Sequence, residues 1–445
     1  MTLRWLGVVL LGLAAQGASG YPLDGYADTG IRRVEGSRLA NEGLVQDVKQ
    51  PPGALLTTAE VDLRLRDYPS MGLPAPDAEL AGQLLQLLEA EPVDSYAIAL
   101  LDISDPAHPV YAEHRGEHRQ NVGSVGKLLA ALGLFQALAE AWPDPAERTC
   151  VLRSAQLVAD DFAHSDHHTI RIFDVPTRTL VRRPMQDGDR GSLWEYLDWT
   201  LSVSSNSAAA MVMRDAMMLK ALGQDYPPPL DQVPAFFSSR SGAELTDLFQ
   251  QTFWVPVTDN GLSLDEFRQG SFFTAGGKRR VDGGGNSYAS PRGLMNFALK
   301  MEQGALVDDW SSLQIKRLLY MTERRIRYAS APPLREAAVY FKSGSLYRCQ
   351  PEAGFTCHPY HGNVYNYMNS LAIVEDTVDG RPLRYIAVVL SNVLKRNGAE
   401  DHQALGGAIH RLMRQRHTQA HSQAPAEVEV KVEADAATAP SGPGH

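Results

Sequence analysis

The residues best suited to chemistry in this chain are a serine and a lysine placed three positions apart. Ser124 and Lys127 come directly before the segment 128–138, which is apolar on nearly every side and therefore predicts a buried helix. In a helix with about 3.6 residues per turn, residues i and i+3 share a face, so the Lys127 amine can lie beside the Ser124 hydroxyl. N–H groups at the helix start would stabilise an oxyanion there. The pattern predicts a nucleophilic serine with a lysine base.

A second lysine could tune this pair. The segment Lys342-Ser343-Gly344 stands at the end of a strand-like apolar run, where its side chains can line a pocket. A lysine acts as a base only when burial or a nearby cation lowers its pKa, and Lys342 could be that cation. Lys342 could also bind a carboxylate, while Gly344 lets a substrate approach the backbone closely. In isolation, the segment is only a strand that runs into a turn.

A third polar group precedes a helix of small residues. In isolation, Ser204-Ser205-Asn206 is typical of a helix N-cap. Beside the other two segments, a better interpretation is a Ser204 hydroxyl that relays protons and an Asn206 side chain that holds an amide.

Together, the three segments resemble the S-x-x-K, S-D-N and K-T-G motifs of class A β-lactamases and related penicillin-binding proteins, in the same order. The resemblance covers roughly residues 77–415 and includes the segments 191–213 and 289–307, which are similar to flanking helices of that family. It implies an α/β sandwich beside a helical subdomain.

The resemblance also implies roles for individual residues. Ser124 would be acylated, Lys127 would be the base or proton relay, and Ser204 would pass a proton to the leaving nitrogen. Asn206 would hold the side-chain amide of the substrate.

The substrate carboxylate and the oxyanion are assigned in the same way. Lys342 and Ser343, next to Gly344, would bind the carboxylate, and the backbone N–H groups of Ser124 and Ser345 would form the oxyanion hole.

The chain departs from the family pattern at several points. Ser205 stands where Asp is usual, Ser343 stands where Thr is usual, and the longer spacing between the motifs implies extra loops. The family's deacylating Glu lies between the second and third motifs, with an amide-bearing residue close after it. That pattern has no clear match here, and Glu266 is the best candidate for the base.

Composition excludes some classes of partner. The 445 residues include 42 basic and 52 acidic side chains, and no Lys/Arg-rich block is present, so neither nucleic acid nor an anionic membrane surface is an expected partner. The segment 164–168, which contains three His and one Asp, is expected to be a polar loop rather than a metal site. No metal or other cofactor is expected.

The first twenty residues are typical of a secretory signal: Arg4, then an apolar run over 5–15, then Ala18-Ser19-Gly20. We expect cleavage close to Gly20, no membrane span in the mature chain, and a periplasmic or secreted protein. Cys349 and Cys357 flank a turn-rich segment, so they form either a small disulfide or two free surface thiols, with Cys150 left over.

The order of elements is helix, two strands, a block of helices, three strands and a final helix. We expect helices over 77–90, 193–219, 291–302, 311–322 and 401–414, and strands over 95–101, 109–114, 338–345, 367–374 and 384–393. The fold class is therefore α/β, with a mixed five-stranded sheet assembled from both ends of the chain, flanked by helices and joined by a helical subdomain.

The chain divides into four parts: a signal at 1–20, an N-terminal extension at 21–76 that is either poorly ordered or a segment ahead of the domain, a catalytic domain at 77–417 and a disordered tail at 418–445. The leading hypothesis is a secreted serine hydrolase that opens the amide of a β-lactam through a Ser124 ester. The alternatives are a D-Ala-D-Ala peptidase acting on peptidoglycan and a non-catalytic domain that binds cell-wall peptides.

Overall fold

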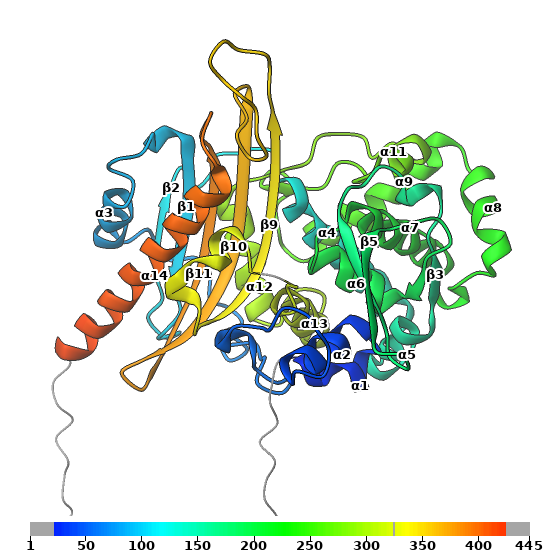
Figure 1. Ribbon diagram of the computed structural model, residues 1–445, viewed down its shortest axis with the longest axis horizontal. Coiled ribbons are helices and arrows are strands. Elements are labelled where there is room, and N and C mark those ends of the chain that lie inside the picture. The colour runs from blue at the N-terminus through cyan, green and yellow to red at the C-terminus, as the bar shows by residue number, and fades with distance from the viewer. Residues whose placement is uncertain (1–21, 324, 424–445) are drawn as a thin grey trace, which may run out of the picture.

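The computed structural model describes residues 22–323 and 325–423 (Figure 1). The expected signal, its cleavage site, and the part of the expected tail beyond residue 423 lie outside these residues.

The centre of the fold is a five-stranded sheet in the order β2-β1-β11-β10-β9. Its strands are β1 (Tyr96–Asp102), β2 (Val110–His114), β9 (Ala338–Arg348), β10 (Tyr365–Val378) and β11 (Arg381–Asn392). The sheet is assembled from both ends of the chain, as the sequence predicted. Every neighbouring pair is antiparallel, so the sheet is not mixed. Three of the neighbouring pairs, β1–β2, β9–β10 and β10–β11, are consecutive strands joined by loops without the crossover helix that a parallel pair needs.

Helices cover both faces of the sheet because the side chains of its central strands alternate between two apolar layers. Ile98 and Leu100 belong to the layer that contains α3 (Ala78–Gln86) and α14 (Gly398–Gln423). Ala99 and Leu101 belong to the layer that contains α12 (Pro291–Glu302) and α13 (Asp309–Tyr320). In Figure 1, α14 crosses the sheet on the left, and β9 lies at the edge nearest the remaining helices.

Those remaining helices form the expected helical part. They are α4 (Lys127–Ala141), α5 (Pro145–Ser154), α6 (Leu193–Leu201), α7 (Asn206–Leu222), α8 (Val233–Ser238), α9 (Gly242–Phe253), α10 (Val255–Asp259) and α11 (Ala275–Arg280). Short ribbons connect them: β3 (Gln156–Val158) with β6 (Arg190–Ser192), β4 (Thr169–Asp174) with β5 (Thr179–Pro184), and β7 (Phe267–Arg268) with β8 (Tyr288–Ala289). Helix α4 is central and contacts α6, α7 and α9.

The run Gly123–Ala141 is long and apolar enough to cross a membrane by length and composition, contrary to the expectation that no later stretch would be. Most of it, 78%, is buried inside the molecule. A helix surrounded by protein is apolar on all sides because, like a membrane helix, it has no contact with water. This run is therefore a core helix of the folded chain.

The N-terminal segment is more ordered than the sequence predicted. Residues 22–76 include α1 (Tyr26–Thr29) and α2 (Arg32–Asn41), and Ile31 and Val34 are fully buried in the main core. Arg33 forms a buried ion pair with Asp198 of α6, with 2.5 Å between nitrogen and oxygen. Several other charges of this segment also pair with residues far away in the sequence. The segment is therefore part of the folded body.

The C-terminal helix and the cysteines complete the fold. Helix α14 continues to Gln423, beyond the expected end at residue 414 and into the segment expected to be disordered. Cys349 and Cys357 form the small disulfide, with 6.1 Å between their Cα atoms, and Cys150 is free and exposed. The disulfide closes a loop between β9 and β10.

Candidate active site

Ser124 lies where the sheet meets the helical part. It belongs to a short 3₁₀ turn, Gly123–Gly126, which leads directly into α4. Strand β9 presses against this turn at Gly344, where an added Cβ would lie only 2.6 Å from the backbone nitrogen of Ser124. An added Cβ at Gly123, which has a φ of 54°, would lie 3.1 Å from the backbone nitrogen of Ser345. The backbone nitrogens of Ser124 and Ser345 therefore lie at one junction of two closely packed segments.

Lys127 is fully buried directly below Ser124. Its Nζ donates to Ser124 Oγ at 2.8 Å and to Asn206 Oδ1 at 2.7 Å. The ring of Phe273 lies 4.4 Å from the same Nζ. Burial lowers the pKa of Lys127 to about 7, against a smaller opposing effect of Asp166. A large fraction of the amine is therefore neutral near pH 7, as a base for Ser124 must be.

Lys342 connects the second and third motifs. Its Nζ donates to Ser204 Oγ at 2.8 Å and to the carbonyl oxygen of Ser343 at 2.8 Å. Burial, with smaller effects of the charges on Lys127 and Arg327, holds the pKa of Lys342 well below its usual range. Ser204 adopts a left-handed backbone conformation with a φ of 62°. This conformation accompanies the direct contact of its hydroxyl with Lys342.

Arg327 is a site residue that the sequence analysis missed. Its guanidinium donates to Ser343 Oγ at 2.8 Å and to Ser345 Oγ at 3.0 Å, and it lies over the Tyr360 ring. Burial lowers the pKa of Arg327, and the described group that opposes this effect is Tyr360. An isolated arginine between a helix and a strand carries no motif, so no sequence signal marked it.

These side chains share one cavity of about 610 Å³. Its walls include five of the expected site residues: Ser124, Ser204, Asn206, Ser343 and Ser345. The walls also include His167, His168, Arg327, Tyr347 and Tyr360. Arg327 lines the cavity, and Lys127 and Lys342 are hydrogen-bonded to its wall residues Ser124, Asn206 and Ser204, so basic side chains gather on this side of the cavity.

Asp166 lies against the second motif, at the start of α7. Its Oδ2 accepts hydrogen bonds from Ser205 Oγ and from the backbone N–H groups of Asn206 and Ser207, and its Oδ1 lies 2.6 Å from Nδ1 of His168. Burial alone would raise the pKa of Asp166, but these bonds and the charge of His168 hold it below its usual range. An ionised carboxylate thus anchors the start of α7, and Ser205 serves as its N-cap.

The loop that carries Asp166 also brings together side chains of the kinds that can bind a metal ion. Ligand-type atoms of Asp166, His167 and His168 lie within 4.8 Å of one another. The two oxygens of Asp166 already accept five hydrogen bonds, two from His168 and three from the start of α7. A carboxylate with its lone pairs occupied, next to a His whose Nδ1 is also bound, makes a poor ligand set. The segment 164–168 is a loop, as expected, and hydrogen bonds fix the side chains of Asp166 and His168 within it.

Glu266 does not lie in the cavity, contrary to the expectation for a deacylating base. Its carboxyl group bonds to Asn296 of α12, and the charged groups that act on its pKa are Arg292, Glu117 and Glu113. Burial, as the largest effect, raises that pKa. The loop that carries Glu266 turns it toward α12.

The same loop presents other residues to Ser124. Phe273 lies over the amine of Lys127, and the Oε1 atom of Gln269 lies so close to Gly126 that an added Cβ there would collide with it. An aromatic ring and an amide of this loop therefore lie against the turn that carries Ser124 and Lys127.

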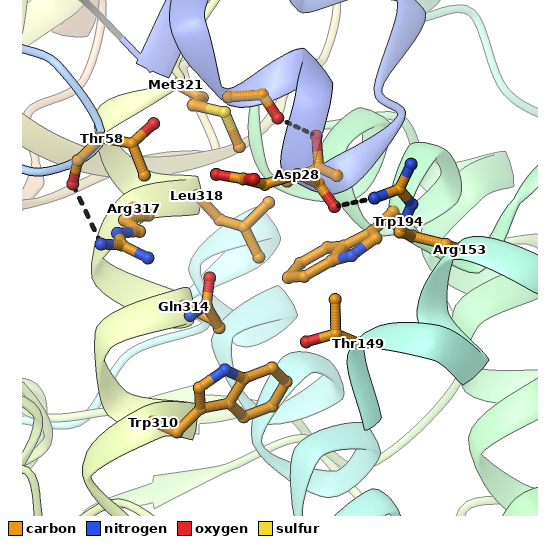
Figure 2. Close-up of a pocket in the computed structure, with 12 residues that line it drawn as sticks. Asp28, Thr58, Thr149, Arg153, Trp194, Trp310, Gln314, Arg317, Leu318 and Met321 are labelled. Carbon is orange, nitrogen blue, oxygen red and sulfur yellow. Dashed lines mark hydrogen bonds between the residues drawn. The ribbon is translucent and has the colours of Figure 1, made fainter. Parts of the chain in front are cut away.

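A second cavity, of about 290 Å³, lies under the N-terminal segment, between α5, α6 and α13 (Figure 2). Trp194 and Trp310 line it, and Arg153 and Arg317 donate to the carbonyl oxygens of Asp28 and Thr58. None of the three motifs contributes to its walls. Ser124, the buried amine of Lys127 that contacts it, and Arg327 all belong to the first cavity.

No protein-family model matches the chain, and no curated protein matches it. Solved structures do. A mutant of PBP-A, in an acyl-enzyme complex with penicillin G, is similar at 15% identity and a TM-score of 0.48, over 77% of this chain and 100% of that one. A β-lactamase from Sphaerobacter thermophilus is similar at 12% identity and a TM-score of 0.45, over 75% and 97%.

A β-lactamase from Xanthomonas campestris is similar at 15% identity and a TM-score of 0.46, over 75% of this chain and 97% of that one.

Proposed function

We propose that this protein is a serine hydrolase that is acylated at Ser124 when it opens the amide of a β-lactam, and that water then releases the acyl group. The observation that carries the proposal is the contact between Ser124 Oγ and the buried amine of Lys127, at 2.8 Å, together with the lowered pKa of that amine. As a structural element, a neutral lysine buried against a serine hydroxyl is a worse choice than an apolar residue of similar size. Its presence therefore points to a role in the reaction.

The contacts suggest how acylation proceeds. Lys127 takes the Ser124 proton while Oγ attacks the amide carbon, and the backbone N–H groups of Ser124 and Ser345 stabilise the oxyanion. When the C–N bond breaks, Ser204 gives its proton to the leaving nitrogen. Lys342, which donates to Ser204 Oγ at 2.8 Å, can then restore that proton.

The cations suggest the class of substrate. Lys342 and Arg327 converge on Ser343, and a carboxylate placed there would form charge-assisted hydrogen bonds with both. The Asn206 side chain is partly engaged with Lys127, and its remaining hydrogen-bonding capacity suits a substrate amide. A β-lactam carries both groups on one small molecule.

A second candidate, a D-Ala-D-Ala peptidase, is supported by the surroundings of Lys127. Phe273, rather than a glutamate, lies over its amine, and Asp166 is the described carboxylate that acts on its pKa. An enzyme without a carboxylate beside the ester hydrolyses it slowly, so we expect a β-lactam adduct that lives long enough to detect by mass.

The proposal includes export of the protein. The Cys349–Cys357 disulfide supports it, because such bonds persist outside the cytoplasm. Mass spectrometry of exported protein tests this, and a chain that keeps Met1 would contradict it.

Reaction with a fluorescent penicillin, followed by intact-mass spectrometry, tests the central proposal. An adduct that forms and then disappears supports β-lactam hydrolysis, and one that persists supports the peptidase. An unlabelled protein would favour a non-catalytic domain that binds cell-wall peptides.

A further inference from the structure

We propose that His168, held in place by Asp166, is the general base that activates water for hydrolysis of the Ser124 ester. This inference rests on the proposed function, because it assigns the second half of that reaction. Nothing in the three motifs points to His168, which lies in the loop between the first and second of them.

The hydrogen bonds of the pair fix its orientation. Nδ1 of His168 lies 2.6 Å from Oδ1 of Asp166, which also accepts the backbone N–H of His168. Asp166 is itself tied to Ser205, Asn206 and Ser207 at the start of α7. Because an ionised carboxylate can only accept, Nδ1 carries the hydrogen and Nε2 is left as the acceptor. The imidazole is thus held in one tautomer by a carboxylate that cannot rotate.

The ring is in the right place for this role. His168 lines the same cavity as Ser124, and its side chain keeps 29% of its surface exposed, so solvent reaches it. His167 stacks on the ring, with 4.4 Å between centroids, and limits its movement on that side. Asn206, which contacts Lys127, is bound through its backbone to the same carboxylate that holds His168.

The charges around His168 favour its neutral form. Burial is the largest effect and lowers the pKa of His168, and the charges of Lys127 and His167 act in the same direction. Asp166 opposes them, but the pKa remains below its usual value of 6.5. The imidazole is therefore mainly neutral at pH 7 and able to accept a proton.

Other described groups are less suited to the task. Glu266 bonds to α12, and Asp166 has its oxygens occupied. Of the described residues that line the cavity, His168 is the one base with a carboxylate partner. This arrangement, in which one group accepts a proton and a second orients it, is the usual support for water activation.

The step balances as follows. Nε2 of His168 takes a proton from water, and the resulting hydroxide attacks the ester carbon. The tetrahedral intermediate collapses with cleavage of the bond between carbon and Ser124 Oγ. The imidazolium proton returns to Oγ through solvent and Lys127, whose Nζ is 2.8 Å away. The products are a carboxylic acid and the free serine, with both bases neutral again.

The test compares His168→Gln with a matched control, His164→Gln. His164 lies on the same loop and also pairs with a carboxylate, Asp187, at 2.7 Å, but it does not line the cavity. Each protein is mixed with benzylpenicillin, and intact-mass spectrometry follows the appearance and the disappearance of the Ser124 adduct. Matching thermal melts show that the variants are folded.

We expect His168→Gln to acylate within about threefold of the unchanged protein and to lose its adduct about 10²-fold more slowly, the size of effect typical of a general base. His164→Gln should match the unchanged protein in both steps. An adduct of His168→Gln that disappears at the normal rate would overturn the inference, as would an adduct of the unchanged protein that never disappears. Failure of the unchanged protein to form any adduct would instead overturn the proposed function as well.

A pH profile separates catalysis from structural support. Deacylation of the unchanged protein should fall as the pH drops below 6.5, where His168 gains a proton, and this inflection should be missing in His168→Gln. Incubation with EDTA should leave deacylation unchanged. Loss of deacylation on chelation, with recovery on addition of zinc, would assign the loop to a metal and refute the base.

Discussion

Lys127 and Lys316 are both fully buried lysines, but their amines meet different partners. Nζ of Lys316 lies 2.7 Å from an oxygen of Glu302 and 2.7 Å from one of Glu375, and it also donates to the carbonyl oxygen of Asp62. Nζ of Lys127 meets a hydroxyl, an amide oxygen and an aromatic ring. Burial with two carboxylates makes a structural cation, whereas burial without a contacting carboxylate lowers the pKa and makes a base.

The surroundings of the two lysines differ in the same way. Lys316 joins α13 to α12, to β10 and to the N-terminal segment, which adds Arg64 as a second partner of Glu375. Lys127 lies where the sheet meets the helical part, and its partners face an open cavity. The charges around Lys316 are thus paired and join elements of the fold, whereas the amine of Lys127 meets neutral groups beside a cavity.

The largest effect expected at the Ser124 site comes from Ser124→Ala, which removes the attacking oxygen. Labelling by penicillin should be abolished, and the thermal melt should be unchanged. Intact mass after incubation measures it. Normal labelling of this variant would place the nucleophile elsewhere. Lys127 would then have no serine to activate, and the proposed difference in role between Lys127 and Lys316 would be contradicted.

The next effect is that of Lys127→Met, which should slow acylation by about 10²–10⁴-fold through loss of the base. Stopped reactions analysed by mass give the rate. The matched change, Lys316→Met, should leave the acylation rate of the folded protein unchanged, and an equal loss in both variants would contradict the separate roles.

Lys127→Met should also change the pH dependence of stability. Lys127 releases its proton near pH 7 in the folded chain, but near pH 10.4 in the unfolded chain. Between these values the unfolded state binds more protons, so the contribution of Lys127 makes the free energy of unfolding rise with pH. The variant should be more stable than the unchanged protein at pH 7, by a margin that narrows toward pH 10. Urea denaturation at several pH values would show a constant margin if Lys127 is not neutral.

Lys316→Met should act on stability alone. It leaves Glu302 and Glu375 buried without their lysine, which should cost about 3–5 kcal/mol of the free energy of unfolding. Urea denaturation measures this loss. A change below about 1 kcal/mol would show that Arg64 and the backbone satisfy the two carboxylates without Lys316.

The smallest effect is expected from Lys342→Ala. Loss of one charge-assisted contact should weaken kcat/KM for a substrate with a carboxylate by about 10–100-fold. An ester substrate without a carboxylate should lose much less, because Arg327 and the serines remain in place. Equal losses for both substrates would assign Lys342 to proton transfer through Ser204 rather than to carboxylate binding.

The three motifs and most of the elements could be predicted because they depend on local patterns. Ser124 and Lys127 are neighbours through one turn of the chain, and the central strands alternate apolar side chains toward two layers. The β4–β5 ribbon was missed because most of its β5 residues are exposed or half-buried, so it lacks an apolar pattern.

Asp166, His168, Arg327 and Phe273 reach the site through tertiary structure alone. Asp166, Arg327 and Phe273 are each distant in sequence from the residue they contact there, and His168 reaches the cavity together with its near neighbour Asp166. All four sit in segments without a motif. Glu266 was misplaced for the same reason, because the fold of its loop, rather than its position between two motifs, decides which way its carboxyl group points.

The sequence by itself determined that Ser124 and Lys127 lie side by side and which two polar segments to examine with them, because spacing along a helix and position at the end of a strand are properties of the local chain. Tertiary structure decided which charged and polar groups surround these residues. Whether a buried lysine becomes a base or half of an ion pair depends on which side chains the rest of the fold brings to it, and no local pattern records that.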